Sequence, residues 1–84
     1  EQYRQALKNI VEILQAVGGN PTHIMELCIY VTSIKEFNER RKETGRAYVD
    51  HIGKFIPAIT LIGVNELFQP DLKVEVTATA LIKP

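Results

Sequence analysis

Cysteine and histidine are the side chains of this sequence that could perform nucleophilic chemistry. Cys28 is its one cysteine, and His23 and His51 are its two histidines. A thiol becomes a nucleophile when a nearby base takes its proton, so Cys28 with either histidine is a candidate pair. No sequence relation brings a histidine close to Cys28, and the alternative is a small residue within a strand. The same residues make neither a disulfide nor a zinc pattern, so we expect no metal and no cofactor.

A basic cluster in the middle of the chain is a second candidate site. It consists of Arg40, Arg41, Lys42 and Arg46. Such a cluster could bind phosphate or hold a carboxylate, but Glu39 and Glu43 are interleaved with it, as on a solvated helix face. The interleaving favours a charged surface over a binding site.

Composition excludes several classes of partner. Ten basic and ten acidic side chains give a formal net charge of zero, which argues against nucleic acid or a membrane surface held by bulk electrostatics. No apolar run approaches the roughly 18 residues of a membrane span, and no leader pattern is present, so we expect a cytoplasmic protein. A chain of 84 residues forms at most one domain and buries only about 60% of its unfolded surface. We therefore expect oligomerisation to stabilise it.

Apolar periodicity predicts a helix followed by a strand in the first part of the chain. Tyr3, Leu7, Ile10, Leu14 and Val17 recur at helical spacing, and a Gly-Gly pair then favours a helix end. From residue 24 to 32 the period changes to two, which indicates a half-buried strand. Its predicted apolar face consists of Met25, Leu27, Ile29 and Val31.

The second part of the chain predicts one long helix and two further strands. Ser33 followed by Glu36 is a capping box at the start of a helix, which continues past Gly45 to a stop at Gly53. Residues 58–64 and 72–82 alternate as strands. We expect these two strands to pair as an antiparallel hairpin through the loop 65–71.

The predicted order is helix, strand, helix, strand, strand. The crossover between the strands that begin at Ile24 and Ala58 should be parallel and right-handed, which places both helices on one sheet face. The opposite face then stays uncovered and more polar. Its predicted members are Glu26, Cys28, Tyr30, Glu75, Thr77 and Thr79.

Residues 55–64 (FIPAITLIGV) and 72–82 (LKVEVTATALI) resemble the end of the RidA (YjgF) family of enamine and imine deaminases, also called L-PSP endoribonucleases. The resemblance implies an α+β fold of the chorismate mutase-like type, with two helices on one face of a mixed β-sheet. Family domains carry further strands before the position of Glu1, so residues 1–84 are expected to be a single RidA-like domain, incomplete at its N-terminus. The neutral charge gives no support to ribonuclease activity.

The resemblance also implies a function. Family members form trimers and hydrolyse reactive enamines or imines to a 2-oxo acid and ammonia in clefts between subunits. Their arginine holds the substrate carboxylate, and their second glutamate acts on water. Ile59 and Thr77 stand at these positions, and neither side chain can do these tasks, so no residue is predicted to be catalytic.

The predicted cleft-lining residues are Ile59, Thr60, Leu61, Thr77 and Tyr30. Alternation in the predicted hairpin places Ile59, Leu61 and Thr77 on the same open face of the sheet. The expected ligand is a small metabolite bound by a homotrimer. The alternatives are a noncatalytic ligand-binding or interaction module, and an assembly subunit whose preceding residues supply the missing groups.

Overall fold

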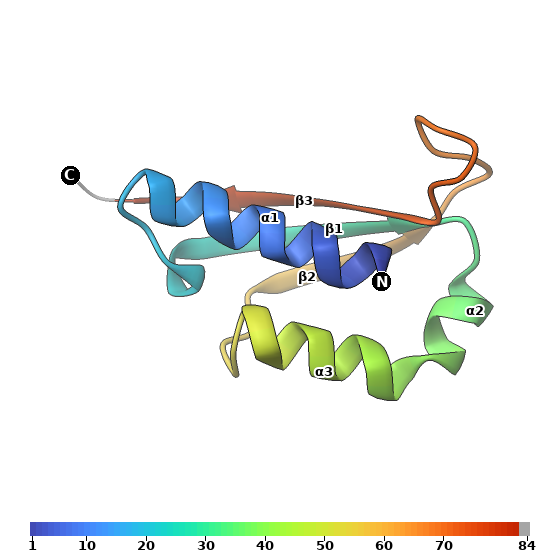
Figure 1. The fold of residues 1–84 in the computed structure, drawn as a ribbon, viewed down its shortest axis with the longest axis horizontal. Coiled ribbons are helices and arrows are strands. Elements are labelled where there is room, and N and C mark those ends of the chain that lie inside the picture. The colour runs from blue at the N-terminus through green and yellow to red at the C-terminus, as the bar shows by residue number, and fades with distance from the viewer. Residues whose placement is uncertain (83–84) are drawn as a thin grey trace.

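A computed structural model describes residues 1–82 (Figure 1). Along the chain it forms α1 (Gln2–Ala16), the 3-10 turn η1 (Pro21–His23), β1 (Ile24–Val31), α2 (Ile34–Glu39), α3 (Arg41–His51), β2 (Ala58–Gly63) and β3 (Val74–Ala80). The predicted α+β class is confirmed, with helices and a mixed sheet.

The sheet has the strand order β2-β1-β3, so β1 is its central strand. β1 pairs in parallel with β2 and antiparallel with β3. The parallel β1–β2 crossover confirms the sequence prediction. The predicted β2–β3 hairpin is wrong, because these strands occupy opposite edges and each pairs with β1.

Burial explains why β1 takes the central place. Leu27, Ile29 and Val31 are almost fully buried, and a strand with such residues gains most from neighbours on both sides. The segment 64–73 leads from the end of β2 to the start of β3 at one end of the sheet (Figure 1). β2 and β3 therefore run antiparallel to each other without touching.

The helices supply the other half of the core. Tyr3, Leu7 and Leu14 of α1 and Ala47 of α3 are buried with the apolar side of β1. Burying a side chain such as Leu7 contributes about 1.5–3 kcal/mol. Val17, predicted to extend the stripe, is 64% exposed, because α1 has already ended before the positive φ of Gly18.

The predicted second helix is divided in two at Arg40. The Arg40 backbone (φ −102°, ψ 32°) departs from helical geometry, and its N–H bonds to Phe37 O in a tighter turn. Ser33 caps α2, since its Oγ accepts from the Glu36 N–H at 3.1 Å. The Glu36 carboxylate pairs with Lys73 Nζ at 3.2 Å, so only the serine half of the predicted capping box forms.

Met25 also departs from the predicted pattern. It is 58% exposed, although Ile24 and Leu27 beside it are buried. The pairing of β1 with β3 shifts between Ile24 and Glu26, as at a β-bulge, where one extra residue leaves the alternation. The bulge removes Met25 from the apolar face and gives its place to Ile24.

Candidate functional site

The face of the sheet turned away from the helices, here called the open face, carries rows of side chains across the strands. In one row Thr60 of β2, Cys28 of β1 and Thr77 of β3 lie side by side, because each threonine is paired with Cys28. The neighbouring row, from β2 to β3, consists of Ile62, Tyr30 and Glu75. Thr60 and Thr77 are exposed and Cys28 is half-buried. The open face thus combines small polar, aromatic, aliphatic and acidic side chains.

The predicted cleft-lining residues divide between the two faces. Tyr30, Thr60 and Thr77 lie on the open face, as the register shows. Ile59 is paired with Leu27 and Leu61 with Ile29. Paired residues project to the same side of a sheet, and Leu27 and Ile29 are buried beneath the helices.

The prediction that Ile59 and Leu61 share a face with Thr77 is therefore wrong. It followed from pairing β2 directly with β3, whereas β1 separates them. Leu61 packs against the core. Ile59 is 43% exposed at the sheet edge, so within one chain Ile59 and Thr77 occupy opposite faces and opposite edges.

Cys28 has no imidazole beside it. His23 Nδ1 accepts a hydrogen bond from the Asn20 N–H at 3.0 Å, five positions before Cys28 along the chain, where a strand advances about 3.3 Å per residue. His51 belongs to the helix layer, and its Nε2 lies 3.5 Å from Arg4 Nη1. The cysteine–histidine pair is not assembled, and the interpretation of Cys28 as a strand residue fits the structure.

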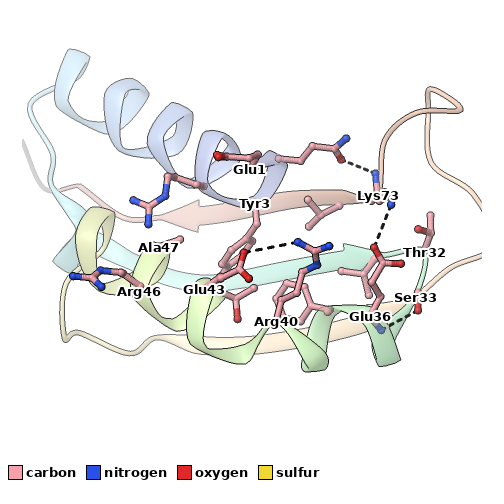
Figure 2. A pocket seen from close by; sticks show the side chains of 16 residues that line it. Glu1, Tyr3, Thr32, Ser33, Glu36, Arg40, Glu43, Arg46, Ala47 and Lys73 are labelled. Atoms are coloured by element: carbon pink, nitrogen blue, oxygen red, sulfur yellow. Dashed lines mark hydrogen bonds and ion pairs between the residues drawn. The ribbon is translucent and has the colours of Figure 1, made fainter.

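A pocket of about 550 Å³ opens on the helix-covered side of the sheet, between the start of α1 and the α2–α3 segment (Figure 2). Tyr3, Phe37 and Ala47 form part of its apolar wall, and Arg40 and Lys73 carry charge into it. Tyr3 and Phe37 pack edge to face, with ring centroids 5.3 Å apart. The sequence interpretation did not find this pocket.

Of the two tyrosines of this helix layer, Tyr3 is buried and Tyr48 is half-buried. Burial, with a smaller effect of the neighbouring Tyr48 phenol, raises the pKa of Tyr3 to about 12. Burial also raises the pKa of Tyr48, whose hydroxyl donates to the Phe55 carbonyl at 2.6 Å. A tyrosine in the apolar stripe of α1 was the sequence signal for the pocket, because a buried phenol needs a partner or a route to solvent.

The basic cluster divides around the break at Arg40. Arg40 and Arg46 line the pocket, and Arg41 and Lys42 do not. Within residues 1–82 no group of three or more histidine, cysteine or carboxylate side chains is placed to hold a metal ion. None of the helices in that range has the length and apolar character needed to cross a membrane.

Comparison with known proteins supports one family. The family model described as Endoribonuclease L-PSP matches residues 1–82. A RutC family protein of Aquifex aeolicus is 33% identical over 81 residues, covering 93% of this chain and 62% of the relative. The chain belongs to the RidA/L-PSP endoribonuclease family, as its closing segments predicted.

Solved structures agree on the fold. A member of the YjgF/YER057c/UK114 family from Mycobacterium tuberculosis superposes with a TM-score of 0.80 at 30% identity, covering 95% of this chain and 64% of that one. A protein of the Rid family from Yersinia pestis gives a TM-score of 0.76 at 30% identity, with 95% and 59% coverage. The chain spans about three fifths of the length of these relatives.

Proposed function

We propose that this chain is part of a cytoplasmic, homotrimeric RidA-like subunit that binds a small metabolite in a cleft between subunits. The observation that carries the proposal is the opposite placement of Ile59 and Thr77 in the sheet. These positions correspond to the two chemical groups of the family motif, yet one chain cannot bring them to a common cleft. A cleft that contains both has to combine the β2 edge of one copy with the open face of another.

The open face supports the same proposal. Its exposed threonines lie beside Tyr30 and the exposed Ile62, and this mixture of small polar, aromatic and aliphatic groups suits a protein interface. Aromatic side chains are enriched in interfaces, whereas charged residues are depleted from their centres. Glu75 belongs to β3, an outer strand of the described sheet, so its carboxylate can lie toward the rim of such a contact.

We further propose that imine or enamine hydrolysis by this protein is weak or absent. Ile59 offers no guanidinium for a bidentate carboxylate contact, and the Thr77 hydroxyl is too weak a base at neutral pH to activate water. The resulting cleft is more apolar than that of an arginine-containing relative. Noncatalytic ligand binding is the second candidate function, and the absence of both chemical groups favours it.

Sedimentation of the full natural chain tests the assembly. We expect a trimer at micromolar concentration, and we expect Thr77→Arg to dissociate it by placing a bulky charge on the open face. Gln15→Arg, on the exposed side of α1, is the matched control and should leave the trimer intact. A stable monomer of the unmodified protein, or a trimer unaffected by Thr77→Arg, would overturn the proposed interface.

Ammonia release from a 2-aminoacrylate-generating system tests the activity, with an arginine-containing relative measured in parallel. We expect much slower release by this protein. The double substitution Ile59→Arg with Thr77→Glu restores both family groups and should increase the rate. Equal rates in the unmodified protein and the relative would show that other groups carry the chemistry.

A further inference from the structure

The pocket between α1 and α2–α3 is separate from the proposed intersubunit cleft. It lies on the helix-covered side of the sheet, whereas Thr60 and Thr77 lie on the open face. At about 550 Å³ it is within the range of small-molecule sites, which are mostly apolar with a few placed polar groups. Val31 and Val74 line it from the ends of β1 and β3, and the Tyr3–Phe37 pair supplies an aromatic wall.

The Tyr3 hydroxyl is the first polar group of this pocket. Tyr3 is only 9% exposed, and among residues 1–82 no group accepts a hydrogen bond from its hydroxyl. The same range contains no fully buried side-chain nitrogen or oxygen without a partner, so the Tyr3 oxygen keeps some exposure, and Tyr3 is one of the residues that line the pocket. A phenol hydroxyl that is partly exposed in a pocket can donate a hydrogen bond to a bound ligand.

The Arg40 guanidinium is the second polar group. Its Nη1 lies 3.8 Å from Glu43 Oε2, which is beyond hydrogen-bond distance. Both side chains are largely exposed, so this pair contributes little and can exchange for a better partner. Two of the other three cations that line the pocket are held more closely, since Arg4 pairs with Asp50 at 2.9 Å and Lys73 with Glu36 at 3.2 Å.

Figure 2 shows Tyr3 and Arg40 from different elements at the centre of the same pocket. Tyr3 comes from the first turn of α1, and Arg40 stands at the break between α2 and α3. The residue at the break in the predicted long helix is thus a cation that lines the pocket. The lining also includes the carboxylates Glu1, Glu36 and Glu43, but its four cations, Arg4, Arg40, Arg46 and Lys73, outnumber them. The aromatic wall, the Tyr3 phenol and the loosely paired Arg40 guanidinium together favour an aromatic anion as ligand.

We propose that this pocket binds a small aromatic monocarboxylate. The ring of the ligand packs against Tyr3 and Phe37. Contacts between aromatic rings contribute more binding free energy than the burial of the same apolar area alone. One carboxylate oxygen accepts from the Tyr3 hydroxyl, and the carboxylate also accepts from the Arg40 guanidinium, for which planar carboxylates are the best-matched partners.

Titration of the full natural chain with phenylacetate, followed by calorimetry and by backbone NMR shifts, tests the proposal. The largest shifts should fall at Tyr3, Phe37 and Ala47. Phenylacetamide, which has the same shape without the charge, should bind at least about tenfold more weakly, because hydrogen bonds to a charged group contribute about 1.5–3 kcal/mol. Equal binding of the two compounds would overturn the carboxylate assignment.

Three variants locate the contacts. Tyr3→Phe removes only the hydroxyl and should weaken binding by about tenfold, and Arg40→Gln should weaken it by about tenfold or more. Arg41→Gln is the matched control, since Arg41 is the next residue but does not line the pocket. Its affinity should stay within about twofold, as expected for an exposed charge outside the contact.

The Thr77→Arg variant separates this site from the proposed intersubunit cleft. Phenylacetate binding in the helix-side pocket should persist in that variant, whatever happens to the trimer. Loss of binding in Thr77→Arg, shifts confined to the open face, or full affinity in Tyr3→Phe would each overturn the proposal. Unfolding midpoints equal to that of the unmodified protein exclude misfolding as the cause of lost binding.

Discussion

The two faces of the sheet are formed by the same strands, but the helices cover only one of them. Leu27, Ile29 and Val31 of β1 are almost fully buried beneath the helices, whereas Cys28 and Tyr30 between them are only partly covered. Since the alternating residues belong to one backbone, the helix layer alone makes the difference. The folding free energy of the single chain therefore depends on the covered face, and the open face is available for interactions with another molecule.

Shortening the side chains at two adjacent positions of β1 should give the largest difference in stability between the two faces. Leu27→Ala should lower the free energy of unfolding by about 2–5 kcal/mol, because it leaves a cavity beneath the helices. Cys28→Ala, one residue further and on the other face, should cost much less. Urea unfolding measures both, and similar losses would show that the open face is also packed within the chain.

A substitution at the N-cap of α2 tests how much this cap contributes to the stability of the helix layer. Ser33→Ala removes the oxygen that accepts from the Glu36 N–H and should lower the unfolding free energy by about 1 kcal/mol. Thr32→Ala, next to it but outside the cap, is the control. An unchanged unfolding midpoint in Ser33→Ala would mean that this cap does not hold α2.

Two glycines separate backbone effects from packing in the same layer. A methyl group at either Gly45 or Gly18 would meet no atom within 4 Å. Gly45→Ala should stabilise the protein by up to about 1 kcal/mol, because Gly45 lies inside α3. Gly18→Ala should destabilise it by about 1 kcal/mol, because Gly18 has a φ of +84°. Thermal unfolding would show opposite shifts; shifts of the same sign would contradict this account.

The smallest expected effect concerns the open face itself. Thr77→Val keeps the shape and β propensity of the side chain and removes its hydroxyl. At concentrations where the chain is monomeric, the free energy of unfolding should change by less than about 0.5 kcal/mol, as for other surface substitutions. A larger loss under those conditions would show that the Thr77 hydroxyl already has a partner within the chain.

The elements of this fold could be predicted where local residue spacing alone determines them. The stripe of α1 and the Ser33 cap follow from local spacing, and both are present. The break at Arg40 was missed, because Phe37 and Thr44 on either side still fit one helical stripe. Met25 was misplaced because a bulge depends on the partner strand, and the partner is not visible in the local pattern.

The candidate site shows what alternation cannot decide. Alternation within β2 was correct, but it did not tell which set of side chains faces the helices. Apolar residues occur on both sides of β2, with Ile59 and Leu61 on one and Ile62 on the other. Its orientation therefore depends on pairing with β1. The pocket around Tyr3 depends similarly on the distance between α1 and α3, which no single segment encodes.

The strand order β2-β1-β3 also bears on how the chain reaches its native state. Neither β2 nor β3 pairs with a sequence neighbour through a tight turn in the described sheet. The pairing of β1 with β2 closes a loop of about 30 residues, and the pairing of β1 with β3 closes a loop of about 50 residues. Each closure has an entropic cost that must be met before the contacts form. We therefore expect the helices to form early and the sheet to assemble late and slowly, with a rate set by contact order rather than by local propensity.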